Sequence, residues 1–228
     1  MTMTTMVLNS RPAPACLNIV FMGKSGWRQS KAKPRKGQKS RSKARIISSD
    51  VVYRGPAFWV STDHVIEPGG VRARRDIVHH TGSVVVLAVD GAGKSTSLVL
   101  ERQYRHAAKR FLWELPAGRI DPGEKELSAA KRELLEETGY AASRWQHILK
   151  FYASPGFVAE TMSVFLATGL RLGKAEPEDD ERIQVRIVPL ARALKMVLGG
   201  KIQDAKTILS VLWLDHQISR GISFVSKR

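Results

Sequence analysis

The stretch Gly118–Tyr140, GRIDPGEKELSAAKRELLEETGY, determines how the rest of the chain is interpreted. Three of its carboxylates, Glu133, Glu136 and Glu137, lie within five residues. Since residues three and four apart are neighbours on a helix, Glu133 would lie beside both of the others. The turn residues at 121–123, Asp-Pro-Gly, end an extended segment just ahead of this helix. The pattern predicts a strand, a turn and a helix with a face of carboxylates.

This face has two interpretations, a binding site for a divalent cation and a solvated surface. Carboxylates so close together repel each other unless positive charge lies among them. Hard cations such as Mg²⁺ bind oxygen ligands and commonly join a few carboxylates to substrate phosphates. For an arbitrary group of glutamates a solvated acidic helix would be favoured, but the spacing of these glutamates argues against it. Leu127, Leu134 and Leu135 are expected on another side of the helix, against a core. The stretch therefore predicts a metal platform.

The order of residues resembles the signature of the Nudix hydrolase family. That signature has a glycine, five residues, a glutamate, seven residues, and then Arg-Glu-aliphatic-x-Glu-Glu-x-Gly followed by a bulky apolar residue. Every position is filled, by Gly118, Glu124, Arg132, Glu133, Leu134, Glu136, Glu137, Gly139 and Tyr140. The aromatic Tyr140 is a mild departure, because an aliphatic residue is commoner there. A motif with so many fixed positions is far more specific than a lone glycine pattern.

The resemblance implies a role for each of these residues. Glu133 and Glu137 would ligate the metal, and Glu136 would assist directly or through water. The backbone carbonyl of Ala117 would be a further ligand. Arg132 would pair with a nearby glutamate and hold the helix. The remaining signature positions with an expected structural role are Gly118, Glu124 and Gly139. The expected cofactor is Mg²⁺, with Mn²⁺ as an alternative.

Length and composition are those of one good-sized domain with additions. The chain has 228 residues, of which 43% are hydrophobic, enough for a sizeable core. Its single cysteine, Cys16, excludes an internal disulfide and fits a reducing compartment, so a cytoplasmic location is predicted. No apolar run approaches the ~18 residues that a membrane span needs, so no membrane association is expected.

Positive charge is concentrated in residues 1–49. They hold eleven of the 37 Lys and Arg and no acidic residue, and we expect this serine-rich tail to be disordered. Three interpretations of the tail are open: an anchor to nucleic acid or another anionic surface, an organelle transit peptide, and a solvated extension. The solvated extension is favoured, since Met22 could begin a shorter chain.

Residues 50–80 alternate and are rich in β-branched side chains, which predicts a small antiparallel sheet with strands at 51–53, 57–66 and 71–79. This layout resembles the sheet that ADP-ribose pyrophosphatases of the Nudix family place before the catalytic domain. There the sheet helps form a homodimer and supplies part of the nucleotide pocket. By this resemblance Arg75 would bind phosphate. Phe58 and Trp59 are candidates for stacking on adenine, although only one of two adjacent strand residues can face the pocket, and core packing is the alternative for either.

Residues 81–228 are expected to form the catalytic domain. Residues 90–96, DGAGKST, are similar to a phosphate-binding loop but lack its first glycine, and a strand-like segment follows, so a hairpin turn is predicted. The segment 101–105 followed by 113–118 resembles the approach to the signature in ADP-ribose-type members. Arg105 would hold the phosphates, because a diphosphate needs cations with several donors. Glu114 would contact the substrate or hold a loop.

The residues after the signature indicate the subgroup and its general base. Pro155, in a Ser-Pro-Gly context, resembles the ADP-ribose pyrophosphatase subgroup, and Glu160 could then reach a ribose hydroxyl or a metal-bound water. By the same resemblance the loop 173–181 closes over the substrate and carries a glutamate base. Glu181 fits the acidic position ahead of the next strand and could also ligate metal, whereas Asp179 occupies a position where glutamate is usual. The base is open among Glu178, Asp179, Glu181 and Glu160, with the signature glutamates as further candidates.

The expected fold is an α/β/α sandwich of the Nudix type with a mixed sheet, preceded by the small antiparallel β domain. Helices are predicted from Pro189 to Leu198 and, after an Asp204 cap, from Ala205 to Ile218. The expected reaction is hydrolysis of a nucleoside diphosphate linked to another moiety, above all ADP-ribose to AMP and ribose 5-phosphate. Alternatives are another sugar nucleotide or a dinucleotide and, outside enzymes, a nucleic-acid-associated module that uses the basic tail.

Overall fold

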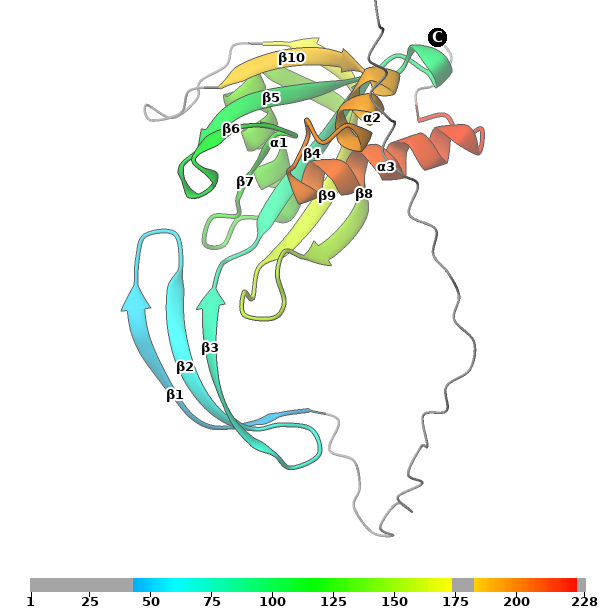
Figure 1. Ribbon diagram of the computed structural model, residues 1–228. Coiled ribbons are helices and arrows are strands. Elements are labelled where there is room, and N and C mark those ends of the chain that lie inside the picture. The colour runs from blue at the N-terminus through cyan, green and yellow to red at the C-terminus, as the bar shows by residue number, and fades with distance from the viewer. Residues whose placement is uncertain (1–42, 174–182, 225–228) are drawn as a thin grey trace, which may run out of the picture. The chain divides into compact units, whose positions relative to one another are not determined.

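The structure, a computed structural model, describes residues 43–173 and 183–224, which contain two sheets and three α-helices (Figure 1). The smaller sheet consists of β1 (Arg45–Arg54), β2 (Trp59–Ile66) and β3 (Arg72–His79). The larger sheet consists of β4 (Ser83–Asp90), β5 (Ser97–Arg105), β6 (Arg110–Glu114), β7 (Ala117–Arg119), β8 (Tyr140–Tyr152), β9 (Thr161–Leu172) and β10 (Gln184–Pro189). The helices are α1 (Glu126–Thr138), α2 (Leu190–Leu198) and α3 (Ala205–Ser219), and two 3-10 turns are η1 (Gly93–Ser95) and η2 (His106–Ala108).

The larger sheet is mixed and has the strand order β10-β5-β4-β9-β8, with β6 paired to β5 and β7 paired to β4. Strands β4 and β9 are parallel, and the other pairs are antiparallel. One edge of β4 pairs with β9, and the opposite edge pairs with two different strands. Residues 83–85 pair with β7, whereas residues 89–90 pair with β5. The divergence of β5 from β4 leaves Ser83, Arg105 and Ala117 around a common cavity.

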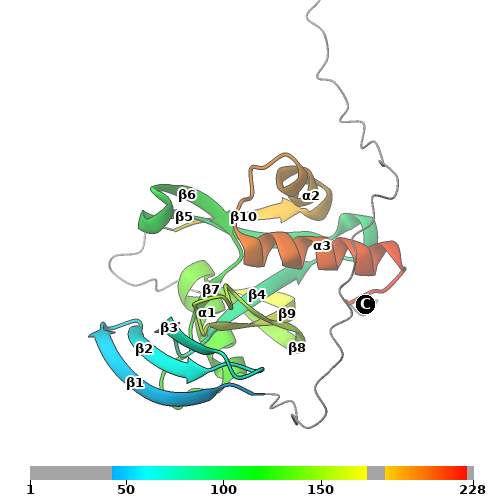
Figure 2. The ribbon, with the colours of Figure 1, turned by 60° about the horizontal axis from the view of Figure 1, so that its bottom comes forward.

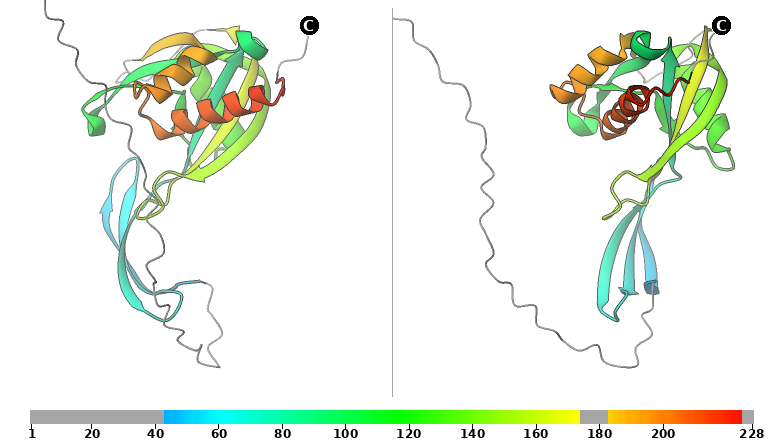
Figure 3. Two further views of the ribbon diagram at one scale, coloured as in Figure 1. Left: turned by 45° about the vertical axis from the view of Figure 1, so that its right-hand side comes forward. Right: turned by 90° about the vertical axis from the view of Figure 1, so that its right-hand side faces the viewer.

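Alternate residues of β4 face two different helical layers. Val85, Leu87 and Val89 are buried in a core with residues of α2 and α3 such as Ala193 and Leu214. The intervening residues of β4 are buried in a second core, which includes Ala129, Ala130 and Leu134 of α1. Burial on both faces explains the continuous apolar run of this strand. Figures 2 and 3 show α2 and α3 on one side of the sheet and α1 on the other, so the predicted α/β/α sandwich is confirmed.

The smaller sheet is antiparallel, as predicted, but its first strand begins earlier than expected. β1 starts at Arg45, because residues 45–54 pair with residues 59–66 of β2. The predicted boundary of the tail at residue 49 is therefore wrong by a few residues, and the rest of the tail, residues 1–42, lies outside the described residues. At the end of β3, Val78 exchanges backbone hydrogen bonds of 2.8 Å with Phe157 and Ala159 of the loop between β8 and β9.

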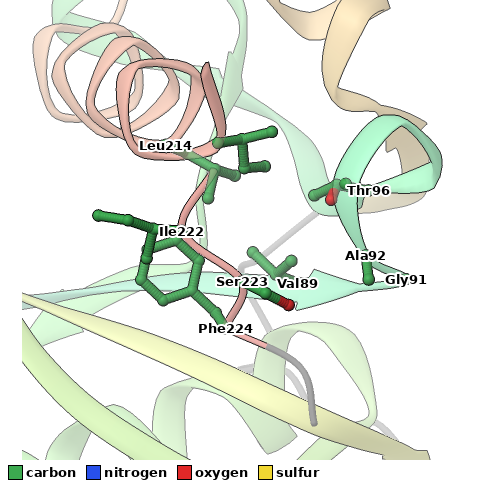
Figure 4. Close-up of a pocket in the computed structure, with 10 residues that line it drawn as sticks. Val89, Gly91, Ala92, Thr96, Leu214, Ile222, Ser223 and Phe224 are labelled. Carbon is green, nitrogen blue, oxygen red and sulfur yellow. The ribbon is translucent and has the colours of Figure 1, made fainter. Parts of the chain in front are cut away.

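The turn between β4 and β5 is a hairpin, as predicted, and not a phosphate-binding loop. Its only helical piece is the three-residue turn η1. The C-terminal residues 222–224 pack beside this turn, where Ile222 and Phe224 lie against Leu214 of α3 (Figure 4). The cavity between them is about 10 Å³, which is at the lower limit for a single water. The side chains in this region are therefore packed against one another and leave no room for a nucleotide.

The predicted C-terminal helices are present as α2 and α3, and the Asp204 side chain accepts the 3.0 Å capping hydrogen bond from the Thr207 amide. Among the described residues, no helix is both long and apolar enough to cross a membrane.

Candidate active site

Helix α1 presents two buried glutamates to strand β7. Glu133 and Glu137 are one turn apart, and both side chains are largely buried. Glu137 Oε2 accepts a 2.9 Å hydrogen bond from the amide of Ala117. A Cβ atom on Gly118 would overlap the carboxyl group of Glu133, so any larger residue at this position would displace that carboxylate. Consecutive residues of β7 thus contact the two carboxylates that the sequence assigns to metal binding.

Arg132 holds the neighbouring carboxylates together. Its guanidinium donates to both oxygens of Glu124 at 3.2 and 3.0 Å, to Glu133 at 2.8 Å and to Glu136 at 3.1 Å. The hydrogen bond to Glu124, the charge of Glu133 and the hydrogen bonds to Glu136 and Glu133 outweigh the effect of burial and raise the pKa of Arg132. The same hydrogen bond lowers the pKa of Glu124. The guanidinium therefore connects the first turn after β7 to the middle of α1.

The donor set fits a hard divalent cation. The side chains are carboxylates, and Mg²⁺ usually takes one or two protein carboxylates and completes its shell with water and substrate oxygens. Glu133 and Glu137 are sufficient for that, and Glu136, with 39% of its side chain exposed, lies on the adjacent part of the helix. In the described ranges, no three His, Cys, Asp or Glu side chains are gathered into a metal-binding group. Ala117 and Arg132 satisfy part of the hydrogen-bonding capacity of the two glutamates here.

A cavity of about 370 Å³ lies beside the signature and is lined by two groups of polar side chains. The first group surrounds Glu160. Ser83 Oγ donates a 2.6 Å hydrogen bond to Glu160 Oε1, and His80 Nδ1 lies 3.6 Å from the same oxygen. The Gly82 amide donates to His80 Nδ1 over 3.1 Å, so the neutral ring carries its proton on Nε2. Glu160 is thus held at the cavity as a hydrogen-bonded carboxylate.

The second group is an ion-pair chain from β5 to α3. Arg105 Nε and Nη2 donate to the two oxygens of Glu114 at 3.0 and 3.1 Å. Lys206 contacts Glu114 Oε2 and, at 3.1 Å, Asp204 Oδ1. Burial alone would raise the pKa of Glu114, but Arg105 and Lys206 outweigh it and lower that pKa. Burial would likewise lower the pKa of Arg105, but Glu114 and the charges of Glu101 and Glu137 raise it.

The comparison with known proteins shows the family. A model of the NUDIX domain matches residues 79–210, more than half of the chain. The chain belongs to the Nudix family. Members of this family generally use divalent metal ions, which agrees with the oxygen ligands on α1.

Several relatives resemble this Nudix chain over most of their length. The ADP-ribose pyrophosphatase of Bacillus subtilis is 38% identical over 75% of this chain and 91% of its own. That of Mycobacterium tuberculosis is 39% identical over 78% and 85%. A GDP-mannose pyrophosphatase of Cronobacter sakazakii is 35% identical over 67% and 81%. The crystal structure of an ADP compounds hydrolase superposes with a TM-score of 0.69 at 24% identity, over 81% of this chain and 98% of that one, which shows the shared fold.

The structure brings some of the predicted substrate residues of this Nudix chain together and leaves others apart. Arg105, Glu114, Ala117, Gly118 and Glu160 line one cavity, although they come from widely separated positions in the sequence. The structure describes nothing at residues 174–182, so the base candidates there, Glu178, Asp179 and Glu181, lie outside the described residues.

Residues of the smaller sheet do not line that cavity. Arg75 pairs with Glu67 at 2.9 Å and borders a separate surface hollow of about 420 Å³, together with Pro155. The Trp59 ring stacks on His79 with the centroids 5.0 Å apart, and Phe58 lies against Tyr53. Within one chain, the residues predicted to contact adenine and phosphate therefore do not line the cavity that contains Arg105.

Sequence reasoning missed several lining residues. No site role was predicted for Ser83 or His80, and Asp204 was predicted only as a helix cap, whereas all three border the cavity. Lys206 had no signal, because its partner Glu114 is 92 positions away in the sequence. The one available clue was the position of Lys206 in the first turn of a capped helix, where a cation is unfavourable unless an acid compensates it.

Proposed function

We propose that this Nudix protein is a Mg²⁺-dependent hydrolase that cleaves ADP-ribose and water into AMP and ribose 5-phosphate. One observation carries the proposal. The buried pair Glu133 and Glu137 contacts Ala117 and Gly118, and the same two β7 residues line a cavity that also contains Arg105. A carboxylate platform thus adjoins a cavity that contains a guanidinium group. The choice of ADP-ribose as the substrate rests on the similarity to the two bacterial ADP-ribose pyrophosphatases.

The side chains of the cavity suit a diphosphate with a sugar attached. Arg105 would bind phosphate oxygens, because a guanidinium offers several donors in a fixed plane. Glu133, Glu137 and the carbonyl of Ala117 would hold Mg²⁺, with Glu136 assisting. When bound, the metal ion neutralises the diphosphate and activates a water. Arg132 would hold the carboxylates in place and offset their mutual repulsion, through the contacts already described.

A carboxylate must accept the proton of the attacking water. Glu160 is the candidate that lines the cavity, where Ser83 fixes one of its oxygens and leaves the other for a substrate hydroxyl or a water. Glu136, on the exposed part of α1, is the signature candidate. Asp179 and Glu181 stay predicted candidates for the base, since they lie outside the described residues. Removal of the base should lower kcat at saturating substrate by roughly 10²- to 10⁴-fold.

The experiment that separates the substrates is a side-by-side turnover measurement. ADP-ribose, GDP-mannose and a diadenosine polyphosphate are compared at equal concentration with Mg²⁺ and with Mn²⁺. The proposal predicts the highest kcat/KM for ADP-ribose. Preference for GDP-mannose would contradict it and would favour the sugar-nucleotide alternative, which the relative from Cronobacter sakazakii makes specific. Turnover of none of them would contradict the enzymatic proposal.

We also propose that the protein is a homodimer through its smaller sheet. Every residue of β1 is exposed, and the exposed residues include the large apolar side chains Ile46, Val51, Val52 and Tyr53. A contiguous exposed apolar patch of this kind is typical of a protein–protein interface. A second copy would be expected to bring Arg75 and an aromatic of β2 to the cavity, as in the resemblance. A monomer in light scattering at micromolar concentration would contradict the dimer. A cytoplasmic location stays a prediction from the single cysteine.

A further inference from the structure

Lys206 is a buried cation that the reaction described above does not use. It lies in the first turn of α3, and 8% of its side chain is exposed. Its ammonium group contacts Glu114 Oε2 and, at 3.1 Å, Asp204 Oδ1. Burying an ammonium ion is costly unless anions compensate it. The two carboxylates meet that requirement and fix the position of the ammonium group.

The position of Lys206 is set by a second chain of hydrogen bonds. Asp204 Oδ2 accepts from the amide and the hydroxyl of Thr207, at 3.0 and 2.5 Å. The Thr207 oxygen in turn accepts a 2.8 Å hydrogen bond from the Leu115 amide. The residue directly after Glu114 is therefore attached to α3 by its backbone, while Glu114 is attached to α3 by its side chain. The start of α3 and the end of β6 form one hydrogen-bonded unit.

Glu114 passes this constraint to Arg105. The Glu114 side chain is 2% exposed, and both of its oxygens accept from Arg105 in a parallel arrangement at 3.0 and 3.1 Å. Such a bidentate pair fixes the plane of a guanidinium as well as its distance. Without Lys206, one oxygen of Glu114 would lose its second cation, and the carboxylate would be free to rotate with Arg105.

We propose that Lys206 is a positioning residue for the substrate diphosphate, acting through Glu114 on the guanidinium of Arg105. The inference rests on the proposed function, because it assigns phosphate binding to Arg105. Direct contact of Lys206 with phosphate is the competing arrangement. The geometry favours the indirect role, since the ammonium group already has two carboxylate partners and is nearly buried.

The first test needs no substrate. The Nε–Hε signal of Arg105 in ¹H–¹⁵N spectra, assigned by its loss in Arg105→Lys, reports the hydrogen bond to Glu114. In Lys206→Met this signal should shift and exchange with water at least about tenfold faster, since a hydrogen bond to a charged group is being loosened. The exposed Lys201→Met, just ahead of α3, should leave the signal unchanged. An unchanged Arg105 signal in folded Lys206→Met would overturn the proposal.

The second test separates positioning from direct contact. Lys206→Met should raise KM for ADP-ribose about tenfold and change kcat little, as expected when binding is lost equally in ground and transition states. Lys206→Arg should recover most of the loss. The double variant Lys206→Met/Arg105→Met should be no worse than Arg105→Met alone, because both changes act on one contact. Effects that multiply would overturn the proposal and indicate that Lys206 itself touches the substrate.

Folding is controlled by a charge-balanced variant. Removing one member of a buried ion pair can unfold a protein. Lys206→Met/Asp204→Asn removes one charge of each sign and keeps a residue that caps helices well, so both tests are repeated on it. If the wild type does not hydrolyse ADP-ribose, the proposed function fails, whereas the Arg105 signal still decides whether Lys206 positions that side chain.

Discussion

Glu137 accepts a hydrogen bond from the backbone amide of Ala117 over 2.9 Å and thereby joins the last turn of α1 to the first residue of β7. The acceptor and the donor are 20 residues apart, at opposite ends of the signature. Ala117 also lines the cavity. The signature is thus a closed structural unit, in which spacing matters as much as residue type.

Gly118→Ala should destabilise the protein, because the added Cβ would overlap the Glu133 carboxyl group. The displaced carboxylate would lose its hydrogen bond from Arg132, which should cost about 1 kcal/mol, and Mg²⁺ binding should also weaken. The free energy of unfolding in denaturant and a Mg²⁺ titration measure the two effects. Gly156→Ala is the matched control, since its Cβ would meet nothing within 4 Å. Equal stabilities of the two variants would contradict this packing.

Arg132→Met should lower the free energy of unfolding by about 2 kcal/mol, because charged hydrogen bonds to Glu124, Glu133 and Glu136 are lost together. Arg132→Lys should recover only part of this, since an ammonium group cannot reproduce the planar fork. Lys131→Met, exposed on the same helix, controls for the loss of a positive charge. Denaturation with equal midpoints for Arg132→Met and Lys131→Met would show that the network does not stabilise α1.

The sequence predicted the sandwich, the signature helix and both C-terminal helices, because apolar periodicity, caps and turns are local signals. It also predicted the hairpin at η1 from a missing glycine and the strand-like residues that follow. The tail boundary was missed because the basic composition continues to Arg45, whereas pairing with Ile66 of β2 decides where β1 begins. The Lys206 contact was missed because long-range ion pairs leave no periodic trace in a single sequence.

The stability of the protein should fall in acid through Glu114, whose folded-state pKa lies below its ordinary value of 4.5. A depressed carboxylate pKa contributes stability above the unfolded value, and that stability is lost as the pH falls through the folded value. The free energy of unfolding from pH 7 to pH 3 should therefore decrease more steeply in the wild type than in Glu114→Gln. Parallel curves for the two proteins would contradict a charged Glu114 that is paired with both Arg105 and Lys206.

Removal of residues 1–42 should leave kcat/KM within about twofold of the wild type, because the described site residues all follow β1. The cut precedes Arg45, so the first strand stays intact. Turnover of the truncated chain is measured beside nucleic-acid binding at several salt concentrations. A large loss of turnover would show that the tail belongs to the site. Strongly salt-dependent binding of RNA or DNA by the full chain alone would instead support the nucleic-acid interpretation of the tail.

The most direct test of the account is the release of AMP from ADP-ribose, with and without Mg²⁺, by the wild type and Glu137→Gln. The amide oxygen of glutamine can still accept from Ala117, so the variant removes the charge and keeps the contact. Glu126→Gln, a half-buried position on the same helix whose carboxylate pairs with Lys150 at 2.7 Å, away from the Glu137 contact, is the control. We expect Mg²⁺-dependent AMP from the wild type and the control, and a kcat/KM at least about 100-fold lower for Glu137→Gln. Near-normal turnover by Glu137→Gln, or equal turnover without a divalent metal, would contradict the metal-centred site.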